Sequence, residues 1–416
     1  MYNGKILDTG YKQINNFFNN RIAQKVFAVL VLLVVVFFLF QVYHKAYRPQ
    51  GYDFKTYIVS ARALAAGENP YETGYEYQYI YPVFFAFIFI PFAYIPYWMI
   101  HFLWYAFSMF AMIYSVLFLV RLVLPAAGVK NEEIKKIIVP LCFVFLVLVP
   151  SLQHNFVNGE SNALILFLMV MFYKYYLKGS VIPASLFLSA GICIKLYPLI
   201  FILFLLFRRK YMYVLATAFF SAIMLLSPFL LLGGKVFAYY DHYLTRYISG
   251  EITGSAYVDK KNMYFSVSRF ISYYFPALYD YSRAAVILTA LAINFLMIGA
   301  VETAGRIPKK PNIEAWVFNI YLVSILLIAP KSQYHHMMYM VPAAALLFLK
   351  AYMDRRFFTP LSLFSSLAFI VFYYIGKVVR TGPYFVIYLL ILFTALTYVI
   401  IKEKKAQEQG ALGNNN

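Results

Sequence analysis

The sequence has little charge and almost no cysteine. Only 13% of its 416 residues are charged, whereas about a quarter of the residues in a soluble globular domain are charged. An ordinary soluble domain is therefore excluded. The two cysteines, Cys142 and Cys193, both lie inside apolar runs, where they act as small buried residues. Their number and placement exclude a disulfide framework and a cysteine zinc site.

The sequence also lacks the signatures of soluble nucleotide-binding and hydrolytic sites. It contains no P-loop, Rossmann glycine fingerprint, nucleophile elbow or zincin helix. No histidines and acids have the spacing of metal ligands, so we expect no essential protein-bound metal and no cofactor. An activated substrate would then have to reach the protein from the membrane.

Long apolar runs dominate what is present. The chain is 63% hydrophobic and 20% aromatic, and its apolar runs are long enough to cross a hydrocarbon layer. They predict an all-α polytopic membrane protein with about 12 transmembrane helices. The expected spans are 24–44, 81–96, 97–122, 136–152, 158–177, 181–207, 211–232, 283–301, 314–329, 335–350, 359–377 and 383–401.

The net charge of +19 does not indicate nucleic-acid binding, because the basic residues flank apolar runs. Lysine and arginine at membrane ends mark the cytoplasmic side and attract anionic lipid headgroups. We therefore expect four short basic connectors, and both termini, to be cytoplasmic. These connectors begin with Arg208-Arg209-Lys210, Arg306, Arg355-Arg356 and Lys402. The connector Arg121–Lys136 does not fit, because the expected spans place it outside.

We interpret residues 1–406 as one transmembrane domain with two long extracytoplasmic loops, at about 45–80 and 233–282. The first is expected to form a surface helix, and the second a surface helix or a partial re-entrant element. Residues 407–416 are polar and are expected to be disordered. No internal repeat of the kind found in many transporters is present.

Asp53 is the first candidate for chemistry. It lies a few residues after the first apolar run and is followed by an amphipathic segment with Phe54, Tyr57, Ile58 and Ala61 at helical spacing. Its carboxylate can cap that helix. It can also act as a general base that takes a proton from an attacking hydroxyl. The two roles are compatible.

Two further groups carry charge into apolar surroundings. His335 and His336 follow Lys331 and form either an interfacial polar cluster or a set of donors for a phosphate or sugar hydroxyl. Lys195 stands in the middle of an expected span, where an ionisable residue is by default functional and needs a partner.

Glu160 is the partner expected for Lys195. The pair is either structural or leaves Lys195 as a point charge for the phosphate of a lipid-linked donor. Asn262, beside Lys260-Lys261, is a weaker candidate for contact with an acceptor or headgroup.

The order of several short motifs resembles the polyprenyl-phosphate-mannose-dependent α-mannosyltransferases of glycosyltransferase family 87, which have the GT-C fold. The resemblance covers most of the chain, and Asp53-Phe54 with Asn69-Pro70-Tyr71 is its most specific part. The motifs are Tyr52-Asp53-Phe54 with Tyr57, Gly67 to Tyr71, Tyr81-Pro82, Asn158-Gly159-Glu160-Ser161-Asn162, Ile194-Lys195-Leu196-Tyr197-Pro198 before Arg208-Arg209, and His335-His336.

The resemblance implies that Asp53 is the general base and that the donor enters from the bilayer. It places the reaction on the extracytoplasmic face of a bacterial cytoplasmic membrane, and it makes Tyr57, Asn69 and Tyr81 candidate substrate contacts. The family often has Gly-Gln-x-Asn where this chain has Gly159-Glu160-Ser161-Asn162, a departure that adds a charge.

These features predict an inverting glycosyltransferase that moves a sugar, by the resemblance mannose, from a polyprenyl-phosphate donor to a lipid or glycan acceptor. Three alternatives stay open. A transporter or flippase of lipid-linked sugars would be expected to have internal repeats or broken helices, neither of which the sequence indicates. A membrane glycan ligase would consume a different lipid donor. A membrane scaffold would give no reason for Lys195.

Overall fold

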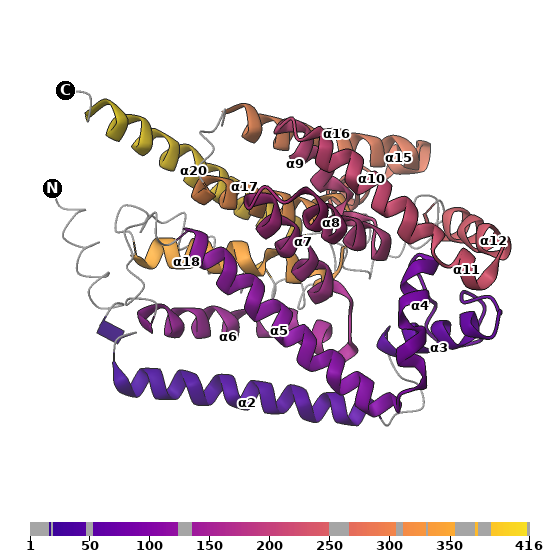
Figure 1. The fold of residues 1–416 in the computed structure, drawn as a ribbon. Helices are drawn as coiled ribbons and strands as arrows, with labels where there is room; N and C mark the ends of the chain where they lie inside the picture. Colours follow the sequence, from indigo (N-terminus) through magenta and orange to yellow (C-terminus); the bar gives the residue numbers. More distant parts are fainter. Residues whose placement is uncertain are drawn as a thin grey trace.

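The computed structural model describes residues 16–17, 20–46, 53–123, 135–248, 266–304, 311–329, 332–353, 371–372 and 384–413. Within these ranges the chain is helical and contains no strand, which confirms the all-α class (Figure 1). The helices are α2 (Arg21–Ala46), α3 (Asp53–Ala65), α4 (Val83–Phe89), η1 (Ile90–Tyr94), α5 (Tyr97–Val123), α6 (Lys135–Asn158), α7 (Asn162–Leu177), α8 (Val181–Ile194), η4 (Tyr197–Ile200), α9 (Phe201–Phe207), α10 (Tyr211–Leu226), α11 (Phe229–Leu232), α12 (Lys235–His242), η5 (Tyr243–Ile248), α14 (Val267–Tyr274), α15 (Pro276–Tyr281), α16 (Arg283–Ala304), α17 (Pro311–Ile328), η7 (Tyr334–Met340), α18 (Val341–Met353) and α20 (Tyr384–Gly413).

Five helical segments of the described chain are long and apolar enough to cross a membrane. They are Arg21–Lys45, Tyr97–Val123, Tyr211–Leu232, Ala285–Thr303 and Tyr384–Ala406. Several shorter apolar helices, including α7 and α8, pack among them. A membrane protein is therefore supported, but the expected count of about twelve spans is not confirmed. The expected span at 359–377 lies almost wholly outside the described residues.

The expected span at 181–207 is not one helix. It folds as α8, η4 and α9, and the chain reverses where Lys195 follows α8. Lys195 contacts Asn162 at the start of α7, whereas the Phe204 ring packs 5.3 Å from that of Tyr176 at the end of α7. Pro198, at the start of η4, explains the break, because proline lacks the N–H that would continue the helix. A broken helix is therefore present after all.

The expected span at 81–96 also reverses instead of crossing. It forms the short helices α4 and η1, and it contains Pro91 and Pro96. Phe89 in α4 and Tyr97 at the start of α5 both pack against Phe54, with ring centroids 6.0 and 6.1 Å apart. The segment therefore leaves Phe54 and returns to it.

These two reversals change the topology. Three complete crossings between Asp53 and Glu160 would have put the two carboxyls on opposite sides. Only α5 and α6 run between them, so both lie at one end of the bundle, which we call the site end. Arg121, in the last turn of α5, then belongs to the opposite end, as do Lys178 and Arg208. Arg121, which did not fit the charge rule, therefore lies at the same end as the basic residues that follow α9.

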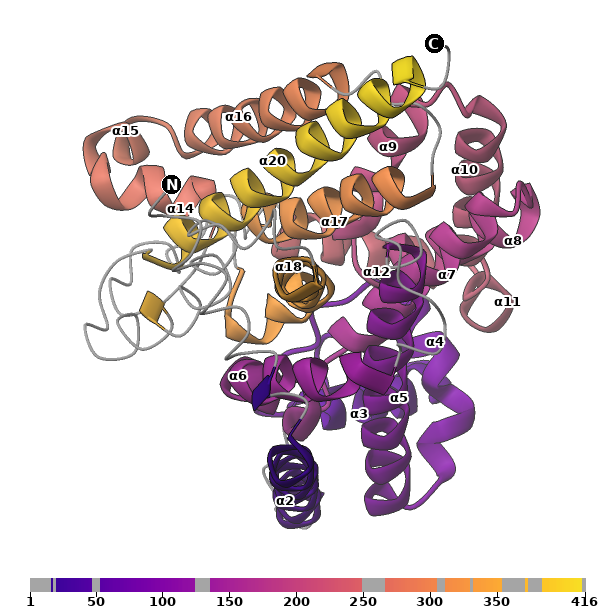
Figure 2. The same ribbon diagram turned by 90° about the vertical axis from the view of Figure 1, so that its left-hand side faces the viewer.

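Helix α2 lies at the edge of the bundle beside α6 (Figures 1 and 2). The two helices run parallel, because Phe27 packs on Phe143 and Gln41 pairs with Gln153 further along both. Only 11% of the most apolar stretch of α2 is buried against the rest of the protein, so most of this helix is left to face lipid.

A buried ion-pair cluster closes the opposite end. Arg208 Nη1 lies 2.7 Å from Glu302 Oε1, and its Nε lies 3.5 Å from Glu314 Oε1. The Tyr321 hydroxyl donates a 2.9 Å hydrogen bond to Glu302. Arg208 is thus more than a basic anchor, since it joins α9 to α16 and α17.

Helix α20 continues through Gly413, so most of the tail that was expected to be disordered is helical. The residues after Ile401 are largely Lys, Glu, Ala and Gln, which are good helix formers and extend a helix already started by the apolar run. Lys404 and Glu408 form an i,i+4 pair at 3.9 Å.

Candidate active site

Asp53 is the first residue of α3, where the positive end of the helix dipole favours a negative charge. Its half-buried carboxyl forms a side-chain hydrogen bond with the carboxyl of Glu160. Burial, and then the repulsion of Glu160, raise the pKa of Asp53 to about 8, while nearby His335 opposes the rise. Near neutral pH the two carboxyls therefore hold a proton between them.

Glu160 is buried in the turn between α6 and α7. Its Oε1 lies 3.6 Å from His335 Nδ1. Burial raises the pKa of Glu160, and the charge of Lys195 partly offsets this. The acid that distinguishes this chain from the family pattern is thus in direct contact with Asp53.

Gly159 allows this close approach. It adopts a φ of +73°, and a Cβ on it would lie 2.5 Å from Phe54 Cβ. Any larger residue would push the α6–α7 turn away from α3. Since Phe54 follows Asp53 and Glu160 follows Gly159, this contact sets the spacing of the two carboxyls.

Lys195 stands at the break between α8 and η4, not in the middle of a span. Its Nζ lies 2.9 Å from Asn162 Oδ1 and 3.0 Å from His336 Nε2. It also lies over the rings of Tyr81 and Tyr197, at 5.6 and 5.3 Å from their centroids. Its expected partner Glu160 acts on it through charge, whereas its Nζ donates to Asn162 Oδ1 and lies beside His336 Nε2.

The aromatic part of the site comes from α3 and from the segment just before α4. The hydroxyls of Tyr57 and Tyr81 lie 3.0 Å apart, and Ser161 Oγ lies 3.4 Å from that of Tyr81. All three side chains are buried. Tyr57 and Tyr81 therefore belong to the cluster that contains Asp53, Glu160 and Lys195.

Other predicted residues are placed elsewhere. The Asn69 side chain accepts a 3.0 Å hydrogen bond from the Tyr71 backbone N–H, and this contact stabilises a turn. Lys331 and Asn262 lie outside the described residues.

Three residues of the cluster were not predicted as site residues. Asn155 and Asn162 both donate to the backbone carbonyl of His335, at 3.0 and 3.1 Å. Tyr339 donates to Asn162 Oδ1 at 3.0 Å. Asn162 lies in a motif that was recognised, so a signal existed for it. Asn155 and Tyr339 join the site only through tertiary packing.

The ring of His336 is fixed by the chain around it. The Gln333 backbone N–H donates to its Nδ1 at 3.0 Å, which directs Nε2 toward Lys195. Among the described residues, no group of three or more His, Cys, Asp or Glu side chains could hold a metal ion.

The fold and this cluster define a helical membrane protein with acid–base and cationic groups gathered at one end. A sequence profile of glycosyltransferase family 87 matches residues 79–330, which is more than half of the 416 residues. The chain belongs to glycosyltransferase family 87 and is a membrane glycosyltransferase. No curated protein matches the chain. The matched segment includes Tyr81, Glu160 and Lys195, while Asp53 precedes it and His335 follows it.

Proposed function

We propose that this protein transfers a sugar, mannose by the family resemblance, from a polyprenyl-phosphate donor to a hydroxyl of a lipid or glycan acceptor, with inversion. The observation that carries the proposal is the carboxyl pair of Asp53 and Glu160 in one cluster with Lys195. A base and a cation are the two groups that such a transfer requires, since the phosphate leaves without an acid.

In the proposed reaction the acceptor oxygen attacks the anomeric carbon of the donor sugar. The new carbon–oxygen bond forms as the bond from that carbon to the phosphate oxygen breaks. Polyprenyl phosphate leaves with the bonding electrons, and Asp53 takes the proton of the acceptor hydroxyl. No other reactant is needed.

Glu160 acts in this scheme by setting the proton affinity of Asp53. A base with a pKa near 8 is closer to the pKa of its target than an ordinary aspartate, so it accepts a proton more readily once it is ionised. His335, in contact with Glu160, stabilises the ionised pair when it carries a proton.

Lys195 is the group that we assign to the donor phosphate. It projects from a helix break into the cluster, and its neighbours Asn162, His336 and Tyr81 are neutral or polar. An ammonium in such surroundings forms strong charge-assisted hydrogen bonds with phosphate oxygens. His335 and His336 border the same space.

The positive-inside rule puts the basic opposite end in the cytoplasm. The site end would then face the extracytoplasmic side, where a lipid-linked sugar can be used without a nucleotide. We propose the cytoplasmic membrane of a bacterium as the location.

The broken helix α8–η4–α9 supports one second candidate, a flippase of lipid-linked sugars, because transporters build midplane sites from discontinuous helices. The carboxyl pair favours the transferase, since lipid movement needs no base.

The test is incubation of purified protein with candidate polyprenyl-phosphate sugars and a membrane lipid extract, followed by mass measurement of the products. Gain of one hexose by an extract component, with release of polyprenyl phosphate, is the expected result. Movement of the donor across vesicles without any transfer would favour the flippase.

A further inference from the structure

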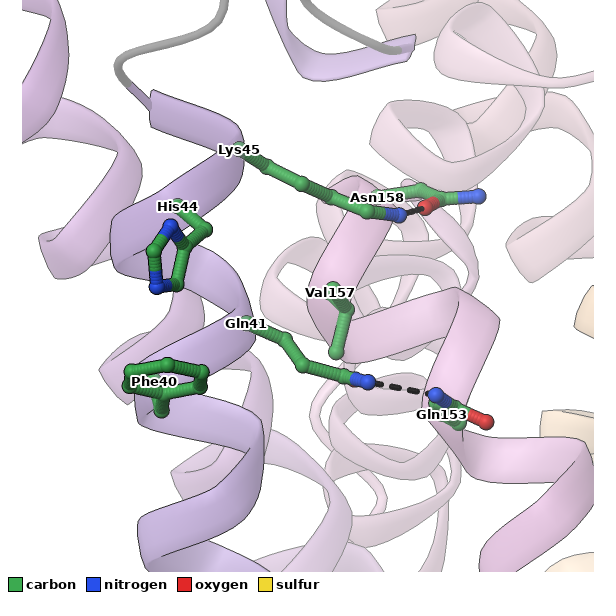
Figure 3. A pocket seen from close by; sticks show the side chains of 7 residues that line it. All are labelled: Phe40, Gln41, His44, Lys45, Gln153, Val157 and Asn158. Atoms are coloured by element: carbon green, nitrogen blue, oxygen red, sulfur yellow. Dashed lines mark hydrogen bonds between the residues drawn. The ribbon is translucent and has the colours of Figure 1, made fainter.

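A polar cavity lies at the site end, between α2 and α6 and outside the cluster of Asp53, Glu160 and Lys195. It has a volume of about 290 Å³ and is lined by Phe40, Gln41, His44, Lys45, Gln153, Val157 and Asn158. Two polar bridges cross it: Lys45 Nζ donates to Asn158 Oδ1, and Gln153 Nε2 donates to Gln41 Oε1 at 2.9 Å (Figure 3).

The cavity lies where a lipid headgroup would be. Helix α2 is strongly apolar up to its last turn, where His44 and Lys45 occur, and charged residues at that point mark the level of the headgroups. Phe40, which lines the cavity, is 58% exposed on a helix that is mostly left to face lipid, so this side of the cavity opens toward the bilayer.

The lining favours an anion. It contains the ammonium of Lys45 and the imidazole of His44, and none of the residues that line it is an acid. A lysine that only reached the water interface would point away from the helix bundle. Lys45 instead points across to α6, together with Gln41 (Figure 3).

We propose that this cavity binds the phosphate group of a membrane lipid. The phosphate oxygens would accept hydrogen bonds from Lys45 and from the amide N–H groups of Gln153 and Asn158, all of which are donors. Asn158 is followed by Gly159 and Glu160, so a bound phosphate would lie against the turn that holds Glu160 beside Asp53.

Two lipids share this chemistry, a glycerophospholipid and a polyprenyl phosphate. The test uses purified protein in detergent, exchanged with phosphatidylglycerol, undecaprenyl phosphate or uncharged diacylglycerol, and counts retained lipid by native mass spectrometry. No sugar transfer is measured, so the result stands apart from that of the proposed reaction.

The variant Lys45→Gln is expected to bind the phosphate lipid about 10- to 100-fold more weakly, as for loss of a hydrogen bond to a charged group. Lys45→Arg keeps the charge and should retain most of the binding. The matched control is Lys235→Gln, since Lys235 is exposed on α12 and does not line the cavity.

Preference for phosphatidylglycerol would identify a phospholipid as the occupant, and preference for undecaprenyl phosphate would identify the prenyl carrier. Equal retention of both, lost together in Lys45→Gln, would support the phosphate site without a preference for the tail. Retention of diacylglycerol equal to that of the phosphate lipids, or no difference between Lys45→Gln and Lys235→Gln, would overturn the proposal.

Discussion

Each end of the bundle holds a pair of carboxyl groups, and the two pairs lie in opposite electrostatic settings. At the opposite end, Arg208 lies between Glu302 and Glu314, at 2.7 and 3.5 Å. At the site end, Asp53 and Glu160 contact each other directly, and His335 is the basic group beside them. The first arrangement compensates charge and holds helices together. The second leaves a proton to be gained or lost, which is what a reaction requires.

The largest effect on folding is expected from Arg208→Met. Removal of the guanidinium leaves Glu302 and Glu314 buried without their cation, which costs about 3–5 kcal/mol in the free energy of unfolding. Thermal or denaturant unfolding in detergent measures this. Arg62→Met is the control at the site end, because Arg62 is exposed and donates to the Ala93 carbonyl. Equal losses in the two variants would contradict the role given to the Arg208 cluster.

Two glycines test whether the site end depends on close packing. Gly159 and Gly179 have similar φ values, +73° and +72°, but only Gly159 faces Phe54. Alanine at either position costs about 1–2 kcal/mol for the left-handed backbone. Gly159→Ala should lose a further amount of about 1–3 kcal/mol from overpacking, and with it most of the transfer activity. Activity that falls equally in the two variants would argue against the contact.

The stability of the protein should respond to pH through Asp53. Its folded pKa of about 8 lies above its ordinary value of 3.8, so the folded state favours the protonated acid. This contribution is complete below about pH 4 and is lost as pH rises toward 8. Asp53→Asn cannot ionise, so its melting temperature should exceed that of the wild type increasingly from pH 5 to pH 8 and by a constant amount above pH 8. A difference that stays constant from pH 5 to pH 8 would contradict the raised pKa of Asp53.

Glu160→Gln is expected to have the smallest effect on transfer activity. It restores the residue common in the family and keeps the size of the side chain. Without the repulsion of Glu160, the pKa of Asp53 falls, although burial still holds it above its ordinary value. We expect the transfer rate of the wild type to rise with pH around the Asp53 pKa of about 8, and we expect this rise to move to lower pH in Glu160→Gln. An unchanged profile would show that Glu160 does not act on the base.

Sequence patterns predicted the helical class, the membrane setting and most of the cluster, because apolar length and short motifs are local properties. They failed at 81–96 and 181–207, where the length of the run indicated a span but Pro91, Pro96 and Pro198 made the chain reverse. Hydropathy measures the affinity of a segment for lipid and does not measure its direction.

The contacts within the site were beyond the sequence for a related reason. Lys195 and Glu160 were expected to pair because both are charges in apolar surroundings. Their actual neighbours are Asn162, His336 and Asp53. These contacts depend on how the fold places α7, η7 and α3 relative to one another. The left-handed turn at Gly159, which brings Glu160 to Asp53, has no signature beyond a single glycine.

Transfer by Asp53→Asn, measured together with donor binding, tests the central claim most directly. The variant keeps the shape of the side chain but cannot accept a proton. With purified protein and a polyprenyl-phosphate sugar that the wild type uses, we predict that the variant binds the donor as the wild type does while its rate of hexose transfer falls by about 10²- to 10⁴-fold. Transfer at the wild-type rate would contradict the assignment of Asp53 as the base.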